Sequence, residues 1–149
     1  MIDFEIPEET KLVRNIVREF VHDVCIPAEK GLTVDTYDDI LAELRQKARA
    51  KGLWCPFFPV EWGGMGLKPL ANALVQMELG ESILGALALN TQGPDDATMM
   101  TLLHHGTEYQ HEAFLKPLVA GEKRVCYAMT EKGGGADATG MKTTAVEDG

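Results

Sequence analysis

The amino-acid sequence predicts a mainly α-helical fold of about six helices, followed by an incomplete β segment. Apolar residues recur with helical spacing through most of the chain, and prolines and glycines stand at the ends of the periodic segments. After residue 121 the spacing changes to the alternation typical of strands. We therefore expect a helical domain over residues 1–121 and the truncated beginning of a β domain over residues 122–149.

Length, composition and charge exclude several classes of protein. The 149 residues are 45% hydrophobic, which is enough for a packed core and too much for a disordered chain. A net charge of -9 disfavours binding to nucleic acid or to an anionic membrane, because both attract basic proteins. The longest apolar stretch, Ile83–Leu89, is too short to span a membrane. Three cysteines without a C-x-x-C pair, and a start without a signal peptide, predict a cytoplasmic protein.

Two helices are expected in the first third of the chain. Pro7 and the acidic pair after it are typical of a helix start, and Ile26-Pro27 is expected to end that helix. The second helix is expected from Thr36 to Lys51, because acidic residues fill its first turn, basic residues its last, and Gly52 follows. The first helix has one wide apolar face, formed by Leu12, Val13, Ile16, Val17, Phe20, Val21 and Val24.

A loop rich in proline and glycine separates these helices from the rest. It covers Leu53–Leu67 and contains both tryptophans, whose large apolar surface predicts that the loop packs onto the helices. Pro69 is expected to begin a third helix, because its ring suits the first helical position. Small residues over 83–92 predict a fourth helix that approaches its neighbours closely.

Two more helices are expected before residue 121. Asp95 or Asp96 is expected to cap the fifth helix, and a glycine follows its apolar residues. Thr107 and Gln110 form a capping-box pattern, which predicts the start of a sixth helix. Pro117 and a nearby glycine are expected to close that segment.

The residues after 121 combine strand-like segments with a glycine-rich loop. Arg124–Thr130 and Met141–Val146 have strand character, and Lys132–Gly140 lies between them. Gly133–Ala138 fits the G-x-G-x-x-A pattern of dinucleotide-binding folds, but those folds need a helix after the loop, and a strand-like stretch follows here. We interpret the loop as a connection able to present backbone N–H groups, and Asp148-Gly149 as a hairpin turn.

The residues alone indicate no catalytic group and no metal site. A nucleophile motif such as G-x-S-x-G is absent. His104, His105 and His111 are close in sequence, but a glycine between them interrupts any common helical face, so histidines at helix ends are the simpler interpretation. Met99 and Met100 either fill the core or line an apolar tunnel, and their spacing is compatible with both.

Four segments of the chain match motifs that occur in the same order in one known family. Cys126–Asp137 is similar to a strand leading into Thr-Glu-Pro-x-x-Gly-Ser-Asp. Pro59 with Trp62–Gly66 is similar to a Pro-x-x-x-Gly-Gly-x-Gly loop between helices. Lys116–Glu122 is similar to the entry into a β domain, and Gly140–Gly149 to the next strand and its turn. Taken together, nearly the whole chain resembles the acyl-CoA dehydrogenase family.

This resemblance implies a flavoenzyme that α,β-dehydrogenates acyl-CoA thioesters with FAD. In the family, a helical domain precedes a β domain and a C-terminal helical bundle, whose carboxylate removes the α proton while the β hydrogen leaves as hydride to the flavin. The positions that match FAD contacts at the flavin edge are Tyr127, Met129 and Thr130. The resemblance places Gly135 and Ala136 beside the pyrophosphate, where loop N–H groups suit an anion.

The same resemblance implies contacts to the substrate. The matching positions are Leu89, Asn90, Gly93 and Ala136, and Gly93 is expected to leave room for a long or bulky acyl chain. Two positions depart from the family pattern, since Lys132 replaces its Pro and Ala136 its Ser. The lost hydroxyl removes a hydrogen bond to phosphate or CoA, worth about 1.5–3 kcal/mol when a charged group is involved.

Partners and activity follow from the resemblance as well. It implies an electron-transfer flavoprotein as electron acceptor and a homo-oligomeric complete enzyme. The family's base lies in a region that these residues do not match, so the isolated chain is expected to be inactive. The alternative is a non-catalytic helical module that oligomerises or binds a partner chain, which predicts a stable complex without flavin.

Overall fold

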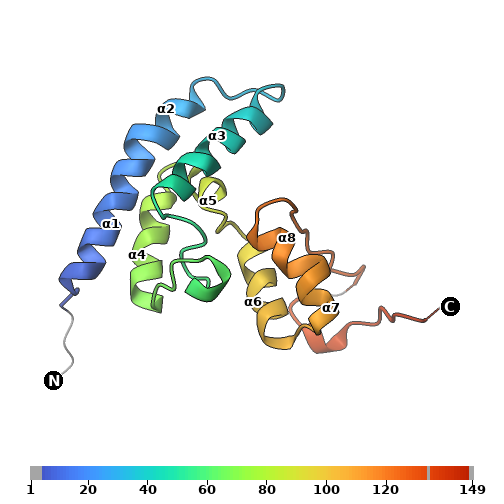
Figure 1. Cartoon of the computed structure of the whole chain (residues 1–149). Coiled ribbons are helices and arrows are strands. Elements are labelled where there is room, and N and C mark those ends of the chain that lie inside the picture. The colour runs from blue at the N-terminus through green and yellow to red at the C-terminus, as the bar shows by residue number, and fades with distance from the viewer. Residues whose placement is uncertain (1–4, 134, 148–149) are drawn as a thin grey trace.

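A computed structural model describes residues 5–133 and 135–147 of the chain. The helices form two groups, with α1 to α5 in the first and α6 to α8 in the second (Figure 1). This arrangement confirms the predicted helical fold. In the described ranges, no helix is long and apolar enough to cross a membrane. The expected turn at Asp148-Gly149 lies outside the described residues.

The first helical segment continues through a proline that was expected to end it. Helix α1 spans Glu8–Phe20, a π turn covers Val21–Cys25, and α2 follows over Ile26–Glu29. The predicted end at Ile26-Pro27 is therefore wrong. In the wider π turn the backbone hydrogen bonds are shifted by one residue, which accommodates a proline that lacks an N–H. A π turn also precedes Pro117.

Helix α1 buries a narrower face than its sequence predicts. Val17 and Phe20 are buried, whereas Leu12 is 61% exposed. Helix α4, over Pro69–Leu79, packs beside α1 and carries the buried Glu78. Two arginines of α1 reach this carboxylate, with Arg14 Nε at 2.5 Å from Oε1 and Arg18 Nε at 2.8 Å from Oε2. A buried charge is thus paired from two sides, and the pairing holds α1 against α4.

Helices α3 and α4 begin where the sequence predicts. Helix α3 spans Tyr37–Ala50, with Thr36 as its N-cap residue. Gly52 follows the helix with a φ of 71°, a backbone conformation that glycine adopts without strain. Pro69 is the first residue of α4. Between these helices, the loop over residues 53–67 packs on the core through Trp54, which is 5% exposed.

The predicted fourth helix is much shorter than expected. Helix α5 covers Gly85–Ala88, not residues 83–92. The chain leaves the helix because Asn90 has a left-handed φ of 54°, which a right-handed helix cannot continue. Helix α6 then spans Asp95–His105. Neither aspartate accepts a capping bond in the expected way, since Pro94 is the N-cap residue and Asp95 is buried.

The last helical segment has the predicted capping box. Thr107 accepts a hydrogen bond from the Gln110 backbone, and the Gln110 side chain in turn accepts one from Thr107 N. Helix α7 spans Glu108–Gln110, a π turn covers His111–Leu115, and α8 spans Lys116–Val119. As in the first segment, the π turn ends two residues before a proline.

Two clusters of buried side chains form the core. The first fills the space between α1, α3, α4 and α5 around Phe20 and Leu44. The second joins Trp54 and Phe58 to the helices α6 and α8. The chain passes between the clusters at two places, residues 53–55 and residues 89–95. We call Leu89–Asp95 the linker.

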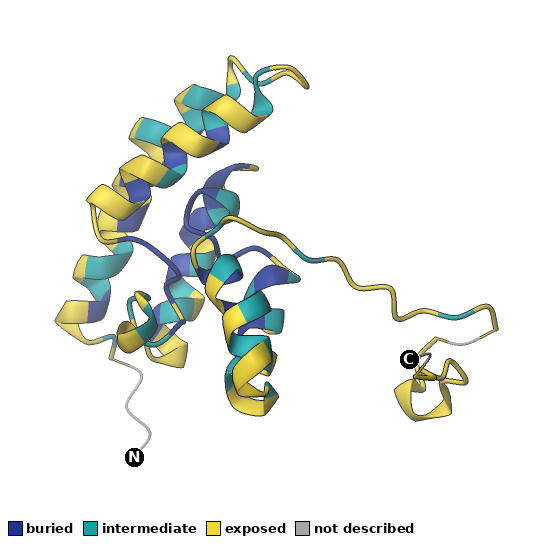
Figure 2. Cartoon of the chain, turned by 45° about the vertical axis from the view of Figure 1, so that its right-hand side comes forward, coloured by how far each residue is buried: buried dark blue, intermediate teal, exposed yellow. Residues whose placement is uncertain are grey.

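After Val125 the chain runs away from the helices as a mostly exposed segment (Figure 2). The strands expected at Arg124–Thr130 and Met141–Val146 are absent from the described residues. A strand requires a ladder of backbone hydrogen bonds to a neighbour, and these two stretches do not form one. The Glu131 carboxylate instead accepts backbone N–H groups of Lys142 at 2.9 Å and Thr143 at 2.6 Å. A short 3-10 turn covers Ala138–Gly140.

Candidate functional site

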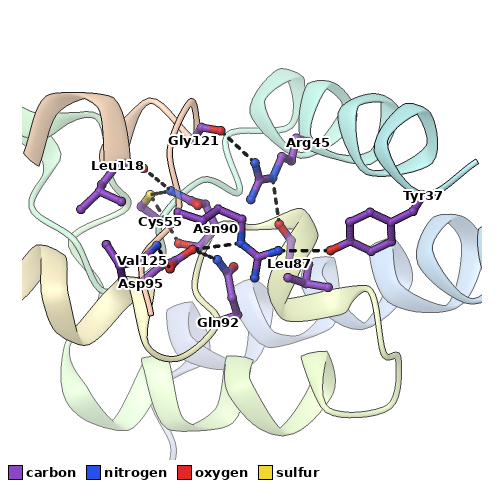
Figure 3. Close-up of polar contacts among 11 residues, drawn as sticks. Tyr37, Arg45, Cys55, Leu87, Asn90, Gln92, Asp95, Leu118, Gly121 and Val125 are labelled. Carbon is purple, nitrogen blue, oxygen red and sulfur yellow. Dashed lines mark hydrogen bonds and ion pairs between the residues drawn. The ribbon is translucent and has the colours of Figure 1, made fainter. Parts of the chain in front are cut away.

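A buried carboxylate fixes the point where the extended segment leaves the helices. Asp95 is 1% exposed, and its Oδ1 accepts a hydrogen bond from Val125 N at 3.0 Å. Its Oδ2 accepts a bond from Gln92 Nε2 and lies 3.5 Å from Arg124 Nε (Figure 3). A charged acceptor binds N–H donors more strongly than a neutral one. Asp95 therefore positions the exit segment, which we define as residues 125–137.

The linker is also tied to the loop and to α8. Asn90 Nδ2 donates to Leu118 O at 2.9 Å and to Cys55 Sγ at 3.3 Å. Cys55 has a φ of 44°, and its thiol donates to Asn90 O at 3.7 Å. Burial raises the pKa of Cys55 to about 11, so the thiol is neutral and unreactive near pH 7. The pair is structural, and its bonds hold the left-handed turn at Asn90.

Arg45 joins α3 to α5 and to the turn that follows α8. Its Nε donates to Leu87 O at 3.2 Å and its Nη1 to Gly121 O at 2.9 Å. Burial lowers the pKa of Arg45, and a guanidinium nevertheless stays charged at neutral pH. Gly121 has a φ of 70°, and a Cβ there would lie 3.0 Å from the Trp54 ring. Trp54 Nε1 in turn donates to Val119 O at 2.8 Å, so the end of α8 is held from two sides.

A cavity of about 290 Å³ lies between the linker, α4 and α6. Its volume is at the lower end of the range for small-molecule sites. Asn90, Thr91 and Ala97 belong to its wall. The remaining lining residues are Cys55, Phe57, Phe58, Asn72, Asp96, Met99 and Met100. Met99 and Met100 both line the cavity, and Met99 also belongs to the second core cluster.

The exit segment brings together three of the five predicted cofactor residues. Met129, Thr130 and Gly135 line a small cavity of about 30 Å³. Tyr127 is 61% exposed and Ala136 is also exposed, and neither lines that cavity. Among the described residues, the backbone groups of residues 126–130 have no hydrogen-bond partner. These N–H and C=O groups are therefore available to a bound molecule.

The predicted substrate residues are dispersed. Asn90 lines the larger cavity, whereas the neighbouring Leu89 side chain is fully buried. Gly93 is exposed and does not line that cavity, and a Cβ built on it would meet no atom within 4 Å. Ala136 lies on the exit segment, and the two cavities share no residue.

Sequence reasoning missed the positioning role of Asp95 and the cavity residue Asn72. Asp95 was expected at most to cap a helix, and its position beside Gly93 and Pro94 gave no sign of burial. Asn72 stands in an apolar stretch of α4, and a lone polar residue there was the available signal.

A model of the acyl-CoA dehydrogenase N-terminal domain matches residues 7–122. The chain belongs to the acyl-CoA dehydrogenase family. A solved acyl-CoA dehydrogenase structure from Mycobacterium abscessus superposes with a TM-score of 0.84 at 29% identity, over 93% of this chain and 38% of that one. This similarity of fold and sequence confirms the resemblance inferred from the four motifs.

Two curated relatives of the chain carry names of reductases. Subunit CarC of the caffeyl-CoA reductase-Etf complex of Acetobacterium woodii is 32% identical over 95% of this chain. The 3-(aryl)acrylate reductase of Clostridium sporogenes is 30% identical, also over 95% of this chain. The chain spans 37% of the length of each of these relatives.

Proposed function

We propose that this chain supplies the N-terminal helical domain and part of the cofactor site of an FAD-dependent enzyme that dehydrogenates acyl-CoA thioesters. The observation that carries the proposal is the match to the family over residues 7–122, joined to an exit segment with free backbone groups. In this interpretation residues 1–121 form the helical domain and residues 122–149 begin the β domain.

The residues of the exit segment fit a flavin. Backbone N–H groups at Tyr127 and Met129 and the Thr130 hydroxyl are available as donors, and these would hold the edge of the isoalloxazine ring. Gly135 has no atom within 4 Å of a built Cβ, which leaves room for the pyrophosphate near Ala136. Bound FAD would supply the acceptor for the hydride that leaves the β carbon. Donors at the ring edge would stabilise the negative charge of the reduced state.

The substrate proposed for this site is a bulky acyl thioester. Leu89, Asn90, Gly93 and Ala136 are proposed to contact it. The ring-lined cavity beside Asn90, with Phe57 and Phe58 in its wall, suits an aromatic acyl group. The names of the two reductases, which specify a caffeyl and an aryl substrate, support this class.

Partners and compartment complete the proposal. An electron-transfer flavoprotein is the proposed acceptor, in line with the Etf complex named for one relative. The complete enzyme is proposed to be a homo-oligomer in the cytoplasm, where the three free cysteines stay reduced. We expect the 149 residues alone to give no turnover, because the proposed mechanism takes its base from the family's C-terminal bundle.

The test is a titration of the chain with FAD, in which NMR monitors the chemical shifts of the backbone amides. We expect shifts at residues 127–136 and a weaker response in Thr130→Val, whose side chain lacks the hydroxyl. Thr144→Val, in the same extended tail, is the matched control and should respond as the native chain does. If the chain oligomerises and FAD causes no shift of the exit-segment amides, the result would favour the alternative of a non-catalytic interaction module. Turnover of acyl-CoA with an artificial acceptor would refute the expected inactivity.

A further inference from the structure

Asp96 is the charged residue in the wall of the cavity between the linker, α4 and α6. Among the described residues, no lysine, arginine or histidine lines this cavity. Burial raises the pKa of the Cys55 thiol to about 11, so this lining group is neutral near pH 7. A charged ligand in the cavity would therefore meet a negative side chain in the wall and no positive one.

The charge of Asp96 is not neutralised by a basic partner. None of the ion pairs in the described part of the chain includes Asp96, whereas the neighbouring Asp95 lies 3.5 Å from Arg124 Nε. The Asp96 side chain is half-buried, so water screens its charge only in part. Like charges repel more strongly in such surroundings than in bulk water, because the effective dielectric constant is lower.

Asp96 also occupies a backbone donor that an anion could otherwise use. Its Oδ1 accepts a hydrogen bond from Ala97 N at 2.7 Å, and Ala97 belongs to the same wall. Both residues lie in the first turn of α6, where backbone N–H groups and the helix dipole favour negative charge. Because the chain's own carboxylate takes this position, a bound anion gains little to offset the repulsion.

The remaining wall suits an uncharged ring. Its apolar surface comes from two aromatic rings and two flexible thioethers, namely Phe57, Phe58, Met99 and Met100. The volume of about 290 Å³ has room for one aromatic ring rather than a long chain.

We propose that Asp96 determines the specificity of this cavity by its charge. The cavity accepts a neutral aromatic or other compact apolar group and excludes one that carries a carboxylate. The occupant is the far end of the acyl substrate, an assignment that rests on the proposed function. Acyl groups with a second carboxylate at that end are therefore excluded, and neutral ring-bearing acyl groups are selected.

The test compares three probes of similar shape on the full chain. Toluene is neutral, benzoate is negative and benzylamine is positive at neutral pH, and NMR titration of the amides at residues 90–100 gives their affinities. The cost of removing a probe from water is the same for the native and variant chains, so each charged probe is expressed relative to toluene and then compared between chains. We expect Asp96→Asn, which keeps an oxygen for Ala97 N, to raise the relative affinity for benzoate at least about 5-fold and to lower that for benzylamine by a similar factor.

Two further variants control for folding and for overall charge. Asp96→Ser keeps a hydroxyl acceptor for Ala97 N and should shift both relative affinities in the same directions, with its fold checked by the amide spectrum. Asp39→Asn removes the same charge from the first turn of α3, at an exposed position. It should leave both relative affinities within about 2-fold of the native values, because solvent and salt screen a distant exposed charge.

The outcomes are decisive in both directions. Unchanged relative affinities in either natively folded variant of Asp96, or an equal change in Asp39→Asn, would overturn the proposal. So would a native chain that binds benzoate at least as tightly as toluene, or that does not bind toluene. A shift confined to the variants of Asp96 supports the proposal even if FAD fails to shift the exit segment, because none of these measurements needs FAD. In that case the assignment to an acyl substrate falls with the proposed function.

Discussion

Replacing Asp95 tests whether one carboxylate positions the exit segment. Asp95→Ala removes the acceptor of Val125 N and of the Gln92 amide, leaving buried donors unpaired. Hydrogen bonds to a charged group contribute about 1.5–3 kcal/mol each, so we expect a local loss of that size at Val125. This corresponds to amide exchange at Val125 that is about 10- to 100-fold faster.

The Asp95→Asn variant provides the matched control. Gln92 Oε1 is buried without a partner among the described residues, so rotation of the Gln92 amide would let it accept from the introduced amide N–H, while Val125 keeps its acceptor. We therefore expect a loss of only about 1 kcal/mol, as for a neutral hydrogen bond in place of a charged one.

Hydrogen exchange followed by NMR measures both variants. The Leu53 amide, bonded to Ala48 O at 2.9 Å within the first core cluster, serves as the internal reference for global unfolding. We expect faster exchange at Val125 in Asp95→Ala, with its ratio to the reference amide changed. If the two amides accelerate equally, or if Asp95→Asn is as damaging as Asp95→Ala, then Asp95 does not act as a local positioning residue.

Three further predictions concern stability and reactivity. The paired arginines, chiefly Arg18, lower the pKa of Glu78 from 4.5 to about 2, so its ion pairs stabilise the fold above pH 4.5 and are lost as the pH falls toward 2. After allowance for solvent screening of the exposed arginines, Glu78→Gln should cost about 1–2 kcal/mol at pH 7 in urea unfolding, and the difference from the native chain should shrink below pH 4.5. Burial raises the pKa of Cys25 to about 12 and that of Cys55 to about 11, so iodoacetamide at pH 8 should alkylate the exposed Cys126 alone, as counted by mass spectrometry. Trp54→Phe removes a buried bond donor and should lower the unfolding free energy by about 1–3 kcal/mol; a smaller change would contradict the role given to its contact with α8.

The sequence predicts those helix ends that depend on neighbouring residues. Gly52, with its positive φ, ends α3, and Thr107 begins the capping box, because these ends depend on local backbone preferences and local hydrogen bonds. Pro27 misled the prediction because a π turn, which periodicity does not encode, accommodates it. The strand character of residues 124–130 is a preference that becomes a strand only beside a partner.

The candidate site was harder to predict than the fold because its parts depend on contacts between distant residues. The motif around Thr130 identified the exit segment through the family resemblance, while Asn72 and Asp95 gave no comparable local pattern. Asn90 leaves the expected helix because its side chain bonds Leu118, a residue of another helix. No spacing rule within residues 83–92 carries that information.

The linker connects the two proposed binding regions, which are the cavity beside Asn90 and the exit segment that begins at Val125. At one end Asn90 belongs to the wall of the cavity, and at the other Asp95 holds the first residue of the exit segment. Both side chains are almost fully buried and hydrogen-bonded, so neither end can shift without breaking bonds to α8 or to Val125. A substitution that distorts the linker is therefore expected to change the cavity and the start of the exit segment together.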